Sequence, residues 1–198
     1  AKMLAKLFLE EGDPRFEHVY GAMEANDLIP SVMDFSRFNM EKRIVMEKCG
    51  YIDPEDIYDY IAQGGYAALV KALQSNPDEI IRTAQNAGLR GRGGAGFSTG
   101  RKWELAKKAA GKDKFVICNA DEGDAGTFSD RLLMEGDPFC LIEGMMIAAR
   151  VVGAARGYIY LRSEYPLAKE ILSEALEAAR QDGLLGPDFD IELRIGAG

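Results

Sequence analysis

The spacing of apolar residues changes along this chain, and the change separates two parts. In the first part the pattern is helical, with a stripe formed by Phe16, Val19, Tyr20 and Met23. Residues 54–63 and 66–74 predict two short helices separated by a Gly-Gly pair, whereas residues 39–52 fit a strand or a loop equally well. We therefore expect a helical N-terminal segment over residues 1–75.

From about residue 76 the pattern alternates between helices and strands. Helical spacing is present at 77–87, 101–110, 138–152 and 166–181. Short apolar or alternating runs predict strands at 114–118, 157–162 and 190–195, and the β-branched first run is typical of a buried parallel strand. This order predicts right-handed βαβ units. We expect an α/β domain over residues 76–198, with a parallel sheet and helices on both of its faces.

Composition narrows the class of protein. The chain has 198 residues, of which 47% are hydrophobic and 28% charged, as in soluble globular proteins. No apolar run approaches the ~20 residues of a membrane span, and Lys6 interrupts the only apolar stretch that could begin a signal peptide. Three scattered cysteines without a C-x-x-C pair argue against a metal or cluster site and fit a reducing compartment. We expect a cytoplasmic protein that does not insert into a membrane.

Charge is distributed unevenly along the chain. The formal net charge is −8, yet residues 82–114 carry nine Lys or Arg against two acidic residues, so this segment is +7 and the remainder is −15. A basic island in an acidic protein predicts a site for an anionic ligand. A nucleic-acid partner is not expected, because such surfaces usually make a whole domain basic.

The basic segment contains five glycines between residues 91 and 100. Glycine allows a ligand to approach the backbone closely, and the surrounding cations suit a phosphate. Gly91, Gly93 and Gly96 match the spacing of a dinucleotide fingerprint, but a helix capped by Asn76 precedes them where that motif needs a strand. The segment does not match a P-loop either, because it contains no Gly-Lys-Ser/Thr. A plain turn between two helices is the remaining alternative.

An acidic segment follows the first predicted strand. It contains Asn119, Asp121, Glu122 and Asp124, at the carboxyl end of a parallel strand, where ligands of open α/β sheets collect. Three carboxylates would repel a phosphate and suit sugar or ribityl hydroxyls, or the N–H edge of a heterocycle. A divalent metal site and a solvated acidic loop are the alternatives.

Together, GLRGRGGAGFSTGRKW and NADEGDAGTFSDR resemble the flavin- and NADH-binding subunit of respiratory complex I. The same module occurs in NAD-linked soluble hydrogenases and formate dehydrogenases. The resemblance covers roughly residues 43–198. It implies flavin mononucleotide (FMN), with FAD as an alternative, and NAD(H) as ligands.

The resemblance also implies roles for individual residues. Phe97 would stack on adenine, and Asp124 would lie where the nicotinamide half enters. The flavin and its phosphate would contact Gly91, Arg92, Gly93, Gly94, Gly96, Lys102, Asn119, Asp121 and Glu122. The sequence departs from the family at Asp124, where Glu is usual, at Leu105, where an aromatic is common, and at Ser98 and Ala125, where Pro is common.

The function implied is oxidation of NADH, or reduction of NAD, with transfer of electrons to iron–sulfur subunits of a larger complex. In the family, a Gly-Glu-Glu loop, a ubiquitin-like domain and a 4Fe–4S helical bundle lie beyond the position of Gly198. Two alternatives stay open: a flavin relay subunit that uses NADH poorly, and an assembly module without a cofactor.

Overall fold

The structure is a computed structural model and describes residues 40, 42–111 and 113–196. Residues from Val45 onward form one compact unit, which contains the sheet and its helices. The helical stripe expected around Phe16 lies outside the described residues, and the expected domain boundary near residue 76 stays a prediction. In the part of the chain that is described, no helix is long and apolar enough to cross a membrane.

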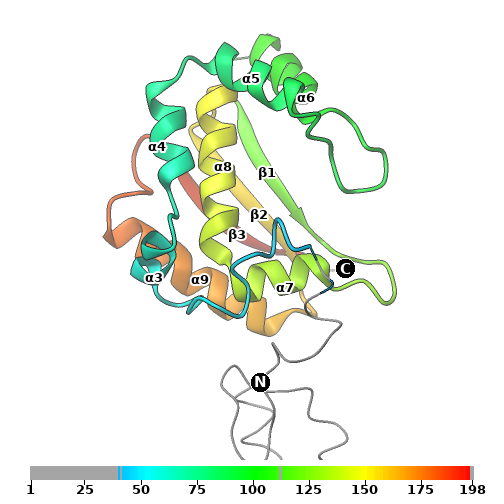
Figure 1. The fold of residues 1–198 in the computed structure, drawn as a ribbon, viewed down its shortest axis with the longest axis vertical. Coiled ribbons are helices and arrows are strands. Elements are labelled where there is room, and N and C mark those ends of the chain that lie inside the picture. Colours follow the sequence, from blue (N-terminus) through cyan, green and yellow to red (C-terminus); the bar gives the residue numbers. More distant parts are fainter. Residues whose placement is uncertain (1–39, 41, 112, 197–198) are drawn as a thin grey trace, which may run out of the picture. The chain divides into compact units, whose positions relative to one another are not determined.

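Three parallel strands form the sheet, in the order β1-β2-β3 (Figure 1). They are β1 (Phe115–Ala120), β2 (Arg156–Arg162) and β3 (Asp190–Gly196). Ala120 pairs with Leu161, and Arg162 pairs with Gly196, so all three carboxyl ends lie at one edge. The α/β class and the parallel sheet are confirmed.

The helices follow the predicted pattern closely. They are α3 (Ile57–Ala62), α4 (Ala67–Gln74), α5 (Pro77–Asn86), α6 (Thr99–Lys108), α7 (Ser129–Gly136), α8 (Pro138–Val152) and α9 (Pro166–Gln181). The expected Asn76 cap is present, as part of a complete capping box with Glu79. Helix α7 was not predicted. Helix α6 begins two residues earlier than expected because Ser98 is its N-cap.

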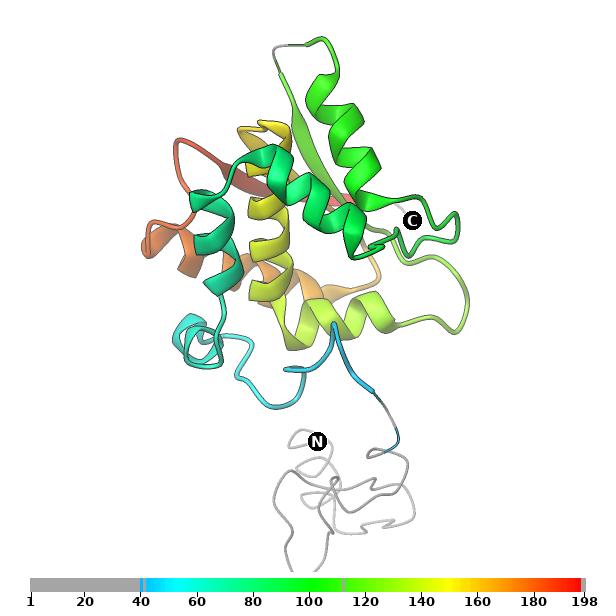
Figure 2. The ribbon, with the colours of Figure 1, turned by 45° about the horizontal axis from the view of Figure 1, so that its top comes forward.

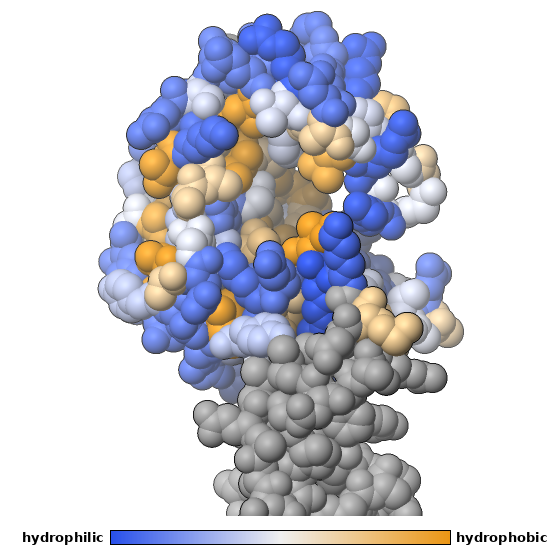
Figure 3. Space-filling view, viewed as in Figure 1, coloured by the Kyte–Doolittle hydropathy of each residue, from blue (hydrophilic) through white to orange (hydrophobic). Residues whose placement is uncertain are grey.

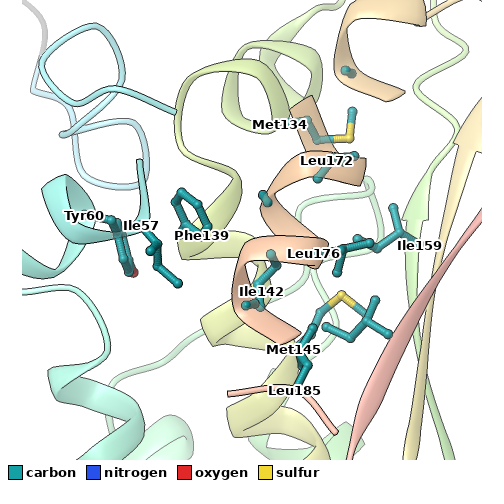
Figure 4. Close-up of a cluster of buried hydrophobic side chains, with 14 of the residues drawn as sticks. Ile57, Tyr60, Met134, Phe139, Ile142, Met145, Ile159, Leu172, Leu176 and Leu185 are labelled. Carbon is teal, nitrogen blue, oxygen red and sulfur yellow. The ribbon is translucent and has the colours of Figure 1, made fainter. Parts of the chain in front are cut away.

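Helices α8 and α9 cover one face of the sheet (Figures 1 and 2). Between them and the strands lies the main core, in which Ile142, Met145 and Leu176 meet Ile159 (Figure 4). Burial of such large aliphatic side chains contributes roughly 1.5–3 kcal/mol each, which makes this layer the main source of stability.

The opposite face of the sheet is exposed within the described residues. Phe115 and Ile117 on β1 are 51% and 67% exposed, and Tyr160 on β2 is 41% exposed. The expectation that residues 114–118 form a buried strand is therefore wrong for one face: the strand is parallel, but alternate residues face outward. Among the described helices, α8 and α9 make the main contacts with the strands, on the face opposite to Phe115 and Ile117.

The buried carboxylate of Glu143 on α8 accepts hydrogen bonds from both α3 and the start of α4. Glu143 Oε2 accepts hydrogen bonds from the Tyr60 hydroxyl at 2.5 Å and the Tyr66 amide at 2.9 Å. Its Oε1 accepts from the Leu69 amide at 2.8 Å. Glu143 thus satisfies the first turn of α4, whose own N-cap, Tyr66, makes no side-chain cap bond.

Helices α5 and α6 form a helical hairpin that packs on the C-terminal end of α8. Ile81 of α5 and Val151 of α8 belong to a second buried cluster, against which Trp103 of α6 packs. The two helices approach most closely at Gly100, where an added Cβ would lie 2.9 Å from both the Gln85 amide nitrogen and the Ile81 carbonyl oxygen. Gly100 therefore fixes the start of α6 against α5.

This contact predicts opposite effects for two helical glycines. Gly100→Ala should destabilise the protein by about 1–3 kcal/mol, because a backbone clash cannot be relieved by rotating a side chain. Gly144→Ala in α8 is the matched control, since a Cβ there meets nothing within 4 Å, and it should stabilise by about 0.5–1 kcal/mol. Unfolding in urea measures both. Equal effects of the two substitutions would contradict the packing described for Gly100.

Candidate functional site

The glycine-rich loop, residues 89–98, joins α5 to α6 and is closed at its base like a hairpin. The Gly91 amide donates to the Phe97 carbonyl at 2.8 Å, and the Thr99 amide donates to the Leu89 carbonyl at 2.9 Å. The Arg90 guanidinium donates to the Gly96 carbonyl at 3.0 Å. The loop is therefore an ordered projection fixed by its own backbone.

At the tip of this loop the backbone is exposed, because three of its residues are glycines with no side chain to cover it. Gly94 and Gly96 have φ values of +98° and +60°, a region that only glycine adopts without strain. A Cβ on Gly93, Gly94 or Gly96 would meet nothing within 4 Å, so these glycines have open space beside them. The amides of residues 92–97 donate no hydrogen bond to the described part of the chain. Such a surface can receive a flat or anionic group against its N–H groups.

Three cations near the loop, Arg101, Lys107 and Lys108, already form ion pairs. Hydrogen bonds from Lys108 and Arg101 lower the pKa of Glu104 to about 2, and Lys107 pairs with Asp78 at 2.6 Å. Arg92 and Lys102 are exposed and form no ion pair with any described residue. On the glycine-rich loop and the first turn of α6 they remain available to an anion, whereas Arg90 donates to the Gly96 carbonyl and Arg101 pairs with Glu104.

The acidic loop, residues 121–128, follows β1 at the carboxyl edge of the sheet. The Asn119 side-chain oxygen accepts from the Asp121 amide at 3.1 Å, and Thr127 donates to the Asp124 carbonyl through its amide and its hydroxyl, at 3.1 and 2.6 Å. Asp121 and Asp124 are exposed, and no described side chain pairs with their carboxylates. They are therefore free to accept hydrogen bonds from a ligand.

Glu122 differs from Asp121 and Asp124 because its carboxylate is already hydrogen-bonded within the protein. Its carboxylate accepts from the amides of Asp130 and Arg131, at 3.1 and 3.2 Å, at the start of α7. Burial alone would raise the pKa of Glu122, but these bonds and two more from Tyr165 and Ser129 outweigh it, so the pKa is lowered. Glu122 is the carboxylate that satisfies the N-terminus of α7.

Arg162, the last residue of β2, and Tyr165, the N-cap of α9, both contact Glu122, and the sequence did not point to either of them. Arg162 donates to the backbone carbonyl of Glu122 and to both carboxylate oxygens of Glu164, at 3.1 and 3.3 Å. Tyr165 donates to Glu122 at 3.1 Å. The signal that could have found Arg162 is its position at the end of a parallel strand next to β1. Glu164 is exposed, follows β2 and pairs with Arg162 at 3.1 Å.

The two loops project from the same side of the unit in both ribbon views, and β3 runs toward that side as well (Figures 1 and 2). The space-filling view shows them standing apart at the surface with a hollow between them (Figure 3). Phe97, 48% exposed, belongs to the glycine-rich loop. Within the described residues, no group of three or more His, Cys, Asp or Glu is arranged to hold a metal ion.

In a comparison with known proteins, one family model matches more than half of the chain. The family model described as the Nuo51 FMN-binding domain matches residues 84–198, which include both loops and the whole sheet. The match begins within α5, so it covers the helix before the glycine-rich loop only in part.

Similar proteins are subunits of larger enzymes. The chain is 50% identical over 163 residues to NADP-reducing hydrogenase subunit HndC of Solidesulfovibrio fructosivorans, covering 79% of this chain and 33% of that protein. It is 42% identical over 182 residues to the F subunit of NADH-quinone oxidoreductase of Aquifex aeolicus, covering 89% and 41%. An air-oxidised NAD+-reducing [NiFe]-hydrogenase structure aligns with a TM-score of 0.61 at 35% identity, covering 80% of this chain and 25% of that one. The chain thus spans a third to two fifths of the two relatives' lengths.

The environment of Glu122 predicts a pH-dependent contribution to stability. A carboxyl whose folded pKa lies below its unfolded value of about 4.3 stabilises the fold above that pH, and the contribution is lost as the pH falls through the folded pKa. Glu122→Gln should therefore cost about 1 kcal/mol at pH 7, a modest figure because the group is partly exposed, and much less at pH 3. Urea unfolding at both pH values measures it, with exposed Glu174→Gln on α9 as the control. A cost that is equal at pH 7 and pH 3 would show that the charge of Glu122 is not involved.

Proposed function

The chain belongs to the Nuo51 FMN-binding domain family, and we propose that it binds FMN between the glycine-rich loop and the acidic loop and forms the electron-entry part of an NADH-oxidising enzyme. The observation that carries this proposal is the open backbone face of Gly93, Gly94 and Gly96, flanked by two unpaired cations.

The donor set of the glycine-rich loop fits a flavin phosphate. Free amides over residues 92–97 offer hydrogen bonds, and Arg92 and Lys102 offer charge. Lys102 lies in the first turn of α6, so the positive end of that helix adds to the attraction for an anion. Gly91 closes the loop base and keeps these groups together.

The acidic loop fits the uncharged polar parts of the cofactor. Carboxylates accept hydrogen bonds from ribityl hydroxyls and from the N–H edge of the flavin ring. We assign this role to Asp121 and Asn119, whose side chains are exposed at the carboxyl edge of the sheet. Glu122 contributes to the same site by holding the loop.

The nicotinamide nucleotide would enter beside the flavin. Phe97 is exposed on the glycine-rich loop and can stack on the adenine ring. Asp124 would lie near the nicotinamide half, where a carboxylate also disfavours the additional phosphate of NADPH.

The chemistry needs placement more than proton transfer. When bound, FMN supplies a ring that takes a hydride from NADH and releases electrons one at a time. The residues of this chain have to hold two flat groups face to face and keep them in register, which accounts for a site of glycines, carboxylates and one exposed aromatic ring.

Partners follow from the proposal. Electrons leaving a flavin singly require an acceptor, and we propose iron–sulfur centres, in the remainder of a longer polypeptide or in partner subunits within the cytoplasm. Two relatives are named as subunits of hydrogenase and quinone oxidoreductase enzymes, which supports this view.

One alternative has a specific observation in its favour. Leu105 on α6 has 48% of its surface exposed, at a position where the family resemblance implies an aromatic ring, and this favours a flavin relay that uses NADH poorly. The absorption spectrum of the intact purified protein tests for flavin. Anaerobic addition of NADH then separates the two functions. The absorbance of the bound flavin should fall promptly only if the protein oxidises NADH efficiently.

Reversal of one charge tests the phosphate contact. Lys102→Glu in the intact protein should weaken FMN binding by about 1–3 kcal/mol, the scale of a charge-assisted hydrogen bond. Lys71→Glu on α4 makes the same change in net charge away from both loops and should leave FMN binding unaltered. Flavin retained after dialysis measures both. Equal retention in the two variants would place the phosphate elsewhere.

Removal of the aromatic ring tests the nucleotide contact. Phe97→Ala should raise the KM for NADH about tenfold with little change in kcat, since stacking acts equally in the ground state and the transition state. Phe115→Ala is the control, because Phe115 on the open sheet face has a similar exposure of 51%. A loss of kcat at constant KM would mean that Phe97 shapes the flavin pocket instead.

A further inference from the structure

Glu122 is the most heavily engaged carboxylate near the two loops. Its Oε1 accepts from the Asp130 amide at 3.1 Å and the Ser129 hydroxyl at 3.3 Å. Its Oε2 accepts from the Arg131 amide at 3.2 Å and the Tyr165 hydroxyl at 3.1 Å. A carboxylate offers about four acceptor positions, so the protein itself uses the whole capacity of this side chain.

The backbone of the same residue is held as well. Arg162 donates to the Glu122 carbonyl oxygen from the end of β2, and Glu164 orients that guanidinium through two hydrogen bonds. Glu122 is therefore tied from two sides: its carboxylate to α7 and to Tyr165, and its carbonyl to the strand next to β1. No other residue of the acidic loop has comparable anchors within the described chain.

Tyr165 is itself held in place. The guanidinium carbons of Arg162 and Arg131 lie 5.2 and 5.5 Å from the centre of its ring, within cation–π range. The ring is fixed by these contacts independently of its hydroxyl. Removal of the hydroxyl alone should thus leave the ring in place and break only the bond to Glu122.

From this arrangement we infer that Glu122, Arg162 and Tyr165 are positioning residues, which clamp the acidic loop to the end of β2 and so hold Asp121 and Asp124 toward the cofactor. The inference rests on the proposed FMN site, and it replaces the direct flavin contact that the family resemblance implies for Glu122. Glu122 acts on the cofactor through the loop and does not contact it.

The clamp can be opened with small substitutions. Tyr165→Phe removes one donor, Glu122→Gln removes the charge and replaces one acceptor with a donor, and the double variant combines them. Tyr58→Phe is the matched control, because the Tyr58 hydroxyl also donates to a carboxylate at 3.1 Å, that of Asp182, and lies on α3. All four variants should be made in the intact protein.

Two measurements then address separate parts of the inference. Amide hydrogen exchange, measured without FMN, should become faster over residues 121–131 in Tyr165→Phe and stay unchanged in α8 and in the Tyr58→Phe control. Titration with FMN should show the dissociation constant rising about five- to tenfold in Tyr165→Phe. The double variant should bind FMN no more weakly than the weaker single variant, because both substitutions open the same clamp.

The outcomes are distinct. Unchanged exchange over residues 121–131 in Tyr165→Phe would overturn the clamp, whatever the flavin does. Additive losses of FMN affinity in the double variant would overturn the positioning role and assign Glu122 a direct contact. If the wild-type protein binds no FMN, the proposed function fails and the assignment of the clamp to a flavin site falls with it. The exchange data would still show separately whether the three residues hold the loop.

Discussion

The parallel register of the three strands is the constraint on which the site depends. Because Ala120 lies opposite Leu161, and Arg162 opposite Gly196, the segment that leaves β1 emerges beside the last residue of β2. Arg162 can then reach the Glu122 carbonyl, and Glu122 can reach the first amides of α7. A shift of the register by one residue would turn Arg162 to the other face of the sheet and disconnect the acidic loop from it.

Most of the fold could be predicted because its elements carry local signals. Helices α8 and α9 have apolar periodicity, a proline in the first turn and, in α8, a glycine at the C-cap, and their predicted bounds match the structure. Helix α7 has no such signal. Its N-cap, Phe128, makes no side-chain bond, and its first amides are satisfied by Glu122, seven residues before the helix begins. A helix capped from a distance cannot be recognised by the residues at its own end. The open face of β1 was missed for a similar reason, since burial of an apolar run depends on what packs above it.

The candidate site could be predicted at the level of segments and not of contacts. The glycines and the acidic residues were visible in the sequence, and the structure places both groups in loops on one side of the unit. What the sequence could not supply is which charges are already used. Lys108 and Arg101 form ion pairs with Glu104, whereas Arg92 and Lys102 remain available to a ligand. In the same way, Glu122 is used by α7 while Asp121 and Asp124 are not. Composition counts charges, and only tertiary contacts show which of them remain available.

The two loops are carried by different elements, which pack against two adjoining buried clusters. The glycine-rich loop is carried by the α5–α6 hairpin, and the acidic loop by the edge of the sheet. Val116 and Phe189 pack against both buried clusters, and α8 contributes side chains to each. The separation of the loops is therefore set by helix packing rather than by either loop. A protein that must hold two flat groups in contact gains most from such an arrangement, because hydride transfer depends steeply on how closely the reacting atoms are held. The close fit at Gly100 and the hydrogen bonds of Glu122 each hold one of the two loops between which the proposed cofactor would lie.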